Sequence, residues 1–339
     1  ADLYRIEGIG RSTVDSIFGF RRWDMVDRIL EQTPKIGARF LTIADADYPA
    51  LLRQIYDPPV IIWVLGEVKA LSDQSIGIVG TRKASSYGLQ VCDHLTMGLA
   101  GQGMTICSGL AYGIDARAHK ATLKQGGTTV AVLGSGVDRI YPGAHRPLAE
   151  AIIGGGGAVI SEYPPGTKPD APHFPVRNRI ISGLSKGLLV IESGVKGGSM
   201  ITARGALDQN REVFAVPHPL LRTHGQGCNK LIQDGLAKLV QNVEDVLIEL
   251  RTPSDVRAHG LAGGIPEVSY AWRNSMDQLS ESGRAICRLL EEQEELHVDA
   301  MGDRLGCSTP EILAELFDLE MNDLVLQKPG KYFRLCTGS

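Results

Sequence analysis

The sequence predicts an α/β protein in which a Rossmann-like, doubly wound parallel sheet lies between a small helical N-terminal module and a C-terminal winged helix. Short apolar runs alternate with helix-length amphipathic segments over residues 60–250, which is the pattern of a parallel sheet covered on both faces. The chain contains 40 glycines, as repeated strand-to-helix turns require. Its 339 residues suffice for two or three domains.

The first 57 residues read as short helices and predict a separate module, 1–57. The segment from Ile6 to Gly10 resembles the turn of a helix-hairpin-helix, whose glycine amides can face a phosphate. The helix before it is nearly absent, so a truncated module with a purely structural role is the alternative. Pro58 and Pro59 end this region because proline cannot continue a helix.

The central domain, residues 58–250, is predicted to bind its ligand at the carboxyl ends of the strands, where the strand order reverses. The apolar runs predict strands at 60–65, 75–79, 104–107, 128–133, 158–161, 188–191 and 212–216. The segments between them predict helices at 87–100, 113–125, 146–154, 176–184, 199–209 and 228–235.

The C-terminal region predicts a flexible linker at 251–275, rich in Gly, Pro, Ser and Ala, and a winged helix at 276–339. The expected elements are helices at 280–292, 298–305 and 308–320 and a hairpin at 324–335 with a Pro-Gly turn. Residues 276–339 contain 13 Asp and Glu against 6 Lys and Arg, a net charge of −7. Phosphate repels such a module, so we interpret it as a protein-interaction or regulatory domain, with DNA binding as the alternative.

Composition narrows the class of protein. The hydrophobic fraction of 43% and the charged fraction of 22% are ordinary for globular proteins, and no apolar run is long enough for a membrane span. The N-terminal residues lack the apolar core of a signal peptide, and a chain that starts at Ala1 is expected to be trimmed. Six scattered cysteines without a Cys-x-x-Cys predict free thiols in the cytoplasm, no disulfide framework and no metal site.

Glycine and small polar residues follow the predicted strands, and these loops are the candidate binding site. Glycine lets a backbone approach a ligand closely, while amides at a helix N-terminus and arginine side chains bind phosphate. The candidates in these loops are Gly80, Thr81, Arg82, Ser108, Gly109, Lys196, Gly198 and Ser199. The alternatives are tight turns for Gly80 and Gly109 and a surface ion pair for Arg82.

The loop before the helix predicted at 176–184 adds an aromatic side chain, Phe174, and the start of that helix adds an amide and two cations: Asn178, Arg177 and Arg179. Phe174 can stack on a base or belong to the core, and Asn178 can cap backbone instead of binding a ligand. The two arginines point in different directions, so one can be structural and pair with Glu162 or Asp170. Residues 139–211 contain nine Lys and Arg against five Asp and Glu, a local net of +4 in a chain of −4. A nucleic-acid site would therefore be a local basic patch.

The usual nucleotide-binding signatures and the His-x-x-x-His metal pair are absent from the sequence. It contains no Walker A motif, and no Gly-x-Gly-x-x-Gly follows the first strand of the domain. We therefore expect no cofactor and no catalytic residue.

Seven stretches resemble the DNA-processing protein A family of bacteria, also called Smf, in the same order along the chain. They are 77–82, 108–115 with 118–119, 132–136 with 141–142, 161–163, 174–184, 198–202 and 213–217. The resemblance implies a cytoplasmic protein that binds single-stranded DNA, is not an enzyme and works as a homodimer through its Rossmann-like domain. It further implies that the protein protects incoming strands during natural transformation and loads the RecA recombinase onto them.

The resemblance also implies a role for each loop. Arg82 would grip a phosphate beside the Gly80-Thr81 turn, Phe174 would stack a base, and the remaining candidates would complete the contacts. This sequence departs from the family at Gly143, where relatives often carry a basic residue, and it has no lysine beside Phe174. Arg139, Arg146 or Lys168 can compensate.

A more distant resemblance points to nucleotide phosphoribohydrolases, which share this Rossmann variant, and an enzyme of that type is the alternative function. Their Gly-Gly-x-Gly-Thr-x-x-Glu motif carries a reactive glutamate. Here the corresponding position is Thr202, whose hydroxyl cannot perform the acid–base or charge-stabilising role of a carboxylate.

Overall fold

The computed structural model describes residues 2–5, 10–250, 279–293, 295–322, 324–328 and 331–335. The chain divides into two compact units, Ala1–Leu250 and Arg251–Ser339. The expected linker at 251–275, most of the N-terminal hairpin and the Pro-Gly turn lie outside the described residues.

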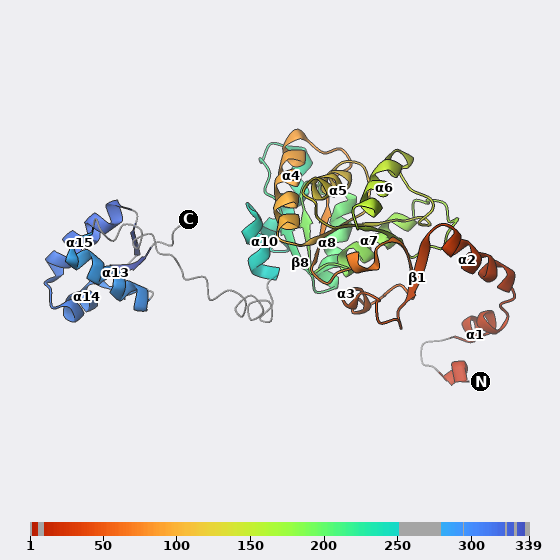
Figure 1. The fold of residues 1–339 in the computed structure, drawn as a ribbon, viewed down its shortest axis with the longest axis horizontal. Coiled ribbons are helices and arrows are strands. Elements are labelled where there is room, and N and C mark those ends of the chain that lie inside the picture. Colours follow the sequence, from red (N-terminus) through yellow and green to blue (C-terminus); the bar gives the residue numbers. More distant parts are fainter. Residues whose placement is uncertain are drawn as a thin grey trace. The chain divides into compact units, whose positions relative to one another are not determined.

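The first unit is built on a nine-stranded sheet with the order β1-β2-β6-β5-β4-β3-β7-β8-β9. Figure 1 labels two of these strands, β1 and β8, and helices of the same unit. The strands from β6 to β9 in this order pair in parallel, whereas β1 pairs antiparallel with β2 and β2 antiparallel with β6. The bounds are β1 Ala38–Thr42, β2 Ile61–Gly66, β3 Ser75–Val79, β4 Thr105–Ser108, β5 Thr129–Val132, β6 Ala158–Ser161, β7 Gly187–Val190, β8 Glu212–Ala215 and β9 Lys238–Leu239.

Helices cover both faces of the sheet. Buried side chains of α4, α5, α6 and α10 pack on one face, and those of α3, α7, α8 and α9 pack on the other. Further helices, α1 and α2, precede β1. The bounds are α1 Arg11–Phe18, α2 Trp23–Lys35, α3 Ala50–Arg53, α4 Ser86–Gly101, α5 Ile114–Lys124, α6 Arg146–Gly154, α7 His173–Gly183, α8 Gly198–Asp208, α9 Gln226–Gln233 and α10 Val243–Leu250.

The predicted fold class is confirmed, with two corrections to its details. The sheet is mixed rather than purely parallel, and residues 1–57 are not purely helical, because β1 lies within them and extends the main sheet. Phe40 of β1 stands opposite Trp63 of β2. Only the first and fourth residues of this edge strand are fully buried, so the strand lacks the alternating pattern from which it could have been predicted. The strand β9 and the helix α10 were also not predicted.

The second unit is the expected winged helix, with its own core. The order of elements is α13, β10, α14, α15, β11 and β12, and the strands form a sheet in the order β10-β12-β11. The bounds are α13 Glu281–Gln293, β10 Leu296–His297, α14 Val298–Leu305, α15 Thr309–Met321, β11 Val325–Lys328 and β12 Tyr332–Leu335. Among the described residues of the chain, no helix combines the length and the hydropathy needed to span a membrane.

Candidate nucleic-acid interface

The sheet order brings the predicted loops to one edge of the first unit. β3, β4, β5 and β7 are parallel neighbours, and the strand order reverses between β3 and β7. Their carboxyl ends therefore lie together at the position where open α/β sheets bind ligands. We use the name rim for the loops that follow β3 to β7 at this edge together with the first turn of α7.

The turn after β3 is held tightly by its neighbours. The N–H of Thr81 donates to the carbonyl of Glu192 at 2.7 Å, and the carbonyl of Thr81 accepts from the N–H of Ile114 at 3.2 Å. A Cβ on Gly80 would lie 2.5 Å from Cγ1 of Ile114, so only glycine fits there. The Thr81 amide is therefore engaged within the protein, and the turn fixes the direction in which Arg82 leaves the sheet.

Arg82 and Phe174 lie at the centre of the rim. The guanidinium carbon of Arg82 is 5.8 Å from the ring centroid of Phe174, which is a cation–π contact. The half-buried Phe174 ring packs at 5.4 Å against the ring of Tyr141, which is 44% exposed. Arg82, Lys83 and Lys196 are exposed, and no carboxylate in the described ranges pairs with any of them. These three cations, together with the exposed Lys168 in the loop after β6, therefore lie at the rim beside partly exposed aromatic rings.

Arg177 is buried, which corrects the expectation that it contacts a ligand directly. Its side chain lies in the interior, with the residue only 4% exposed, and Nη1 donates to the carbonyls of Gly109, at 2.8 Å, and Val132. Burial lowers the pKa of Arg177 to about 10, and the neighbouring Asp115 carboxylate partly offsets this effect. Arg177 therefore holds the loop after β4 and the end of β5 in place through hydrogen bonds in the protein interior.

Ser108 and Gly109 also differ from expectation, because their polar groups are used inside the protein. The Ser108 hydroxyl donates to the carbonyl of Ile78 at 2.6 Å. The buried Asp115 carboxylate accepts from loop amides, that of Gly109 among them; burial raises the pKa of Asp115, while Arg177 and these amides oppose the shift. A Cβ on Gly109 would lie 2.7 Å from both Arg177 Nη2 and Asp115 Oδ2. Asp115 therefore occupies amides that the sequence assigned to a phosphate.

Arg179 and Asn178 bind groups of the protein itself. Arg179 makes two hydrogen bonds to the Glu162 carboxylate, at 2.7 and 3.0 Å, and Nε lies 3.2 Å from Oδ2 of Asp57. The Arg179 side chain is only 19% exposed, which corrects the expectation of a free cation at the edge. The Asn178 amide oxygen accepts from Nε of Arg177 at 3.2 Å. The pair of Arg179 with Glu162 is the structural alternative that the sequence left open.

The loop between β7 and α8 keeps part of its predicted character. Lys196 and Gly198 are exposed, and α8 begins at Gly198 without a side-chain cap at Gly197. Ser199 is buried, and its hydroxyl donates to that of Ser193 at 2.7 Å. The Lys196 ammonium group and the first backbone N–H groups of α8 are thus accessible to an anion, whereas the Ser199 hydroxyl is hydrogen-bonded within the protein.

Aromatic pairs on the rim were missed by the sequence analysis. The exposed Tyr112 meets the ring of His145 edge-on at 4.8 Å, and Tyr163 stacks on His173 at 4.1 Å. With Tyr141, these residues place a tyrosine in the loop after each of β4, β5 and β6. That recurrence was the signal in the sequence that could have revealed them.

Groups that could hold a metal ion, transfer a proton or react as a thiolate are the remaining features of the first unit. No group of three His, Cys, Asp or Glu side chains among them could hold a metal ion. Thr202, at the position of the phosphoribohydrolase glutamate, is buried. Burial raises the pKa of Cys92, Cys107 and Cys228 to about 12, so these thiols stay protonated at neutral pH.

Two family models match the chain. The model described as DNA recombination-mediator protein A matches residues 39–251, and the DprA winged helix domain matches residues 274–331. The first model therefore covers more than half of the chain, and the second coincides with the winged helix.

Relatives and solved structures agree with these matches. The chain is 45% identical to DNA processing protein DprA of Bacillus subtilis (strain 168) over 224 residues, which are 66% of this chain and 75% of that protein. It is 40% identical to Protein Smf of Escherichia coli (strain K12) over 293 residues, 86% of this chain and 76% of that one. DNA processing protein A of Streptococcus pneumoniae superposes with a TM-score of 0.64 at 38% identity, covering 71% and 82% of the two chains. The Helicobacter pylori protein, whose structure is described for its single-stranded DNA binding mode, gives 0.56 at 28% identity over 62% and 95%.

Proposed function

The chain belongs to the DNA recombination-mediator protein A family, and from this premise we propose that it binds single-stranded DNA along the rim. The H. pylori relative is described as a single-stranded DNA binder. A bound strand would lay its phosphates along the exposed cations and its bases against the exposed rings. Phosphate contacts and stacking together provide affinity with little sequence preference.

The observation that carries this proposal is the pair formed by Arg82 and Phe174. A guanidinium without a carboxylate partner lies 5.8 Å from the centroid of a partly exposed ring. This pair of side chains can therefore contact the two repeating parts of a nucleic-acid strand, the phosphate and the base. Gly80 allows the loop that carries Arg82 to pack against Ile114, because a Cβ there would lie 2.5 Å from Cγ1 of Ile114.

We also propose a role for the protein in the cell, which the resemblance to its family suggests. We expect a cytoplasmic homodimer that protects incoming single strands during natural transformation and recombination and delivers them to the RecA recombinase. The winged helix, with its acidic sequence, is expected to serve interaction or regulation.

Fluorescence anisotropy with a labelled oligothymidine strand at several salt concentrations tests the proposal. If Arg82, Lys83 and Lys196 each contact one phosphate, the slope of log affinity against log salt is about −2.1, so binding weakens about 20-fold from roughly 50 to 200 mM salt. Arg82→Ala should weaken all sequences alike and make the slope about 0.7 less negative. Arg39→Ala removes an exposed arginine from β1, at the far edge of the sheet, and should change nothing. Salt-independent binding, or equal slopes for both variants, would refute the rim as the site.

We also propose that the protein does not hydrolyse nucleotides, because Thr202 replaces the glutamate of the phosphoribohydrolase motif. Incubation with nucleoside monophosphates should release no free base. Base release that Arg82→Ala abolishes would favour the enzymatic alternative.

A further inference from the structure

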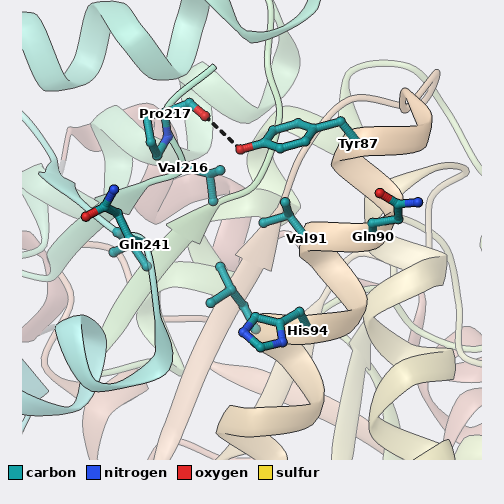
Figure 2. Close-up of a pocket in the computed structure, with 9 residues that line it drawn as sticks. Tyr87, Gln90, Val91, His94, Val216, Pro217 and Gln241 are labelled. Carbon is teal, nitrogen blue, oxygen red and sulfur yellow. Dashed lines mark hydrogen bonds between the residues drawn. The ribbon is translucent and has the colours of Figure 1, made fainter. Parts of the chain in front are cut away.

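A cavity of about 400 Å³ lies between α4 and the residues that follow β8 and β9 (Figure 2). Tyr87, Gln90 and His94 contribute to its wall from α4, and Pro217 and Gln241 contribute from the strand ends. In Figure 2 the segment with Gln241 lies opposite α4, and Tyr87 and Pro217 stand together at one end. Its volume falls within the range of small-ligand sites.

The lining of the cavity is mostly apolar, includes polar side chains, and carries no Asp, Glu, Lys or Arg. Gln90, Gln241 and His94 make no side-chain hydrogen bond to any described residue. Their amide and imidazole groups can donate and accept hydrogen bonds, and valine and leucine side chains supply an apolar surface. These are the groups that bind a neutral heterocycle, and they offer nothing to neutralise a phosphate.

An aromatic ring is fixed at one end of the cavity. The Tyr87 hydroxyl donates to the carbonyl of Pro217 at 3.1 Å, and its ring meets the His218 ring edge-on at 5.2 Å. Tyr87 is still 42% exposed. A ring held in this way can stack on a planar ligand with little further loss of side-chain entropy.

The cavity continues the rim along the same edge of the sheet. β8 and β9 extend the parallel sheet beyond β7, so the residues after them lie at the same carboxyl edge. The N–H of Ser85, the residue that caps α4, donates to the Glu192 carboxylate at 2.8 Å, which ties the start of α4 to the rim loop after β7. Tyr87 lies in the first turn of α4, five positions after Arg82.

We propose that this cavity is a base subsite, which receives one unstacked nucleobase of a strand bound at the rim. The inference rests on the proposed function and extends it to a second set of residues. A free nucleoside presents the same chemistry, so the test must distinguish the two sources of the base.

The test compares the full-length protein with the variant Gln90→Ala/Gln241→Ala on two strands of equal length, oligothymidine and its fully abasic analogue. Both glutamines are exposed, so the variant should fold normally. It should bind oligothymidine about tenfold more weakly, within the range that one base contact contributes, and bind the abasic strand as the wild type does. The salt slope should not change, because no phosphate contact is lost. Gln102→Ala, at the exposed C-cap of the same helix, is the matched control.

Equal binding of oligothymidine by the wild type and the double variant would overturn the subsite, and so would an equal loss on both strands. Thymidine binding that the double variant abolishes, with strand binding unaffected, would assign the cavity to free nucleosides and also overturn it. If DNA does not bind at the rim, the salt slope of Arg82→Ala equals that of the wild type. This outcome distinguishes failure of the proposed function from failure of the base subsite alone. A strand that carries 4-thiothymidine should cross-link to α4 in the wild type and not in the double variant.

Discussion

At the scale of single residues, the rim divides its arginines between the surface and the interior. The guanidinium carbons of Arg82 and Arg177 lie 5.8 and 6.0 Å from the centroid of the Phe174 ring. Arg177 is buried and bound to loop carbonyls, and Asp115 lies beside it, so its charge is compensated within the protein. Only Arg82 remains for a ligand. The buried arginine therefore positions the ring, and the exposed one is proposed to bind phosphate.

Replacing Phe174 tests whether the ring stacks on a base. Phe174→Ala should lower the affinity for oligothymidine by about 1–3 kcal/mol, the usual contribution of one stacked base, and leave the salt slope within error of the wild type. Anisotropy titrations at several salt concentrations measure both quantities. Phe40→Ala removes an exposed phenylalanine from β1 and serves as the control. A loss that is equally large on an abasic strand would argue against stacking.

His119 predicts how stability depends on pH. Its ring, on α5, is fully buried, Nδ1 lies 2.7 Å from the hydroxyl of Thr129 at the start of β5, and Nε2 has no hydrogen-bond partner among the described residues. Burial lowers the pKa of His119 from 6.5 to about 3. The unfolded chain therefore takes up a proton at higher pH than the folded protein does, and stability is lost as the pH falls from about 6.5 toward 3.

The wild type should lose about 2 kcal/mol more unfolding free energy between pH 7 and pH 5 than His119→Gln loses. Urea denaturation at the two pH values measures the difference. His224→Gln, at an exposed histidine, should behave like the wild type. Identical pH dependence in wild type and His119→Gln would show that His119 is not held neutral.

At the scale of elements, the sequence predicted the seven main strands and six helices of the first unit because each has the expected periodicity and length. It failed where periodicity was weak. The edge strand β1 shows no alternation, and β9 has only two residues. Helix α7 was predicted from residue 176 but begins at His173, because Pro175 falls in the first turn, where a helix needs no N–H from it. Phe174 is consequently held by a helix rather than by a loop.

The glycine run 154–157, which begins at the last residue of α6, provides a prediction at this scale. The sequence suggests only that a helix stops and turns here, yet the glycines of this run differ in their structural surroundings. A Cβ on Gly157 would lie 2.3 Å from the carbonyl oxygen of Thr129 in β5, whereas a Cβ on Gly154 would meet nothing within 4 Å. Gly157→Ala should destabilise the protein by about 1–3 kcal/mol, as overpacking does, and Gly154→Ala by less than about 0.5 kcal/mol. Urea denaturation checks both. If the two variants had equal unfolding free energies, the backbone around Gly157 could move away from β5 without loss of stability, and the prediction would be wrong.

At the scale of the whole molecule, the division into a Rossmann-like unit and a winged helix was predictable, as was the edge of the sheet where the candidate loops gather. Which side chains reach that edge was not, because sequence spacing cannot show whether Arg177 is buried and Arg82 exposed. The cavity beside α4 escaped prediction for a related reason. Its residues come from one helix and two strand ends that only the assembled sheet brings together.

The division also predicts where DNA affinity lies. Residues 1–250 form a compact unit with their own core and contain the whole rim and the cavity, while the winged helix has a separate core. A chain ending at Leu250 should therefore bind oligothymidine within about threefold of the full-length affinity and with the same salt slope, because it retains every proposed phosphate contact. A somewhat higher affinity of the shorter chain would also agree with this prediction, since residues 276–339, which it lacks, carry a net charge of −7 that repels phosphate. Anisotropy titrations of both chains make the comparison, and a loss of tenfold or more, with a flatter slope, would place phosphate contacts in the winged helix.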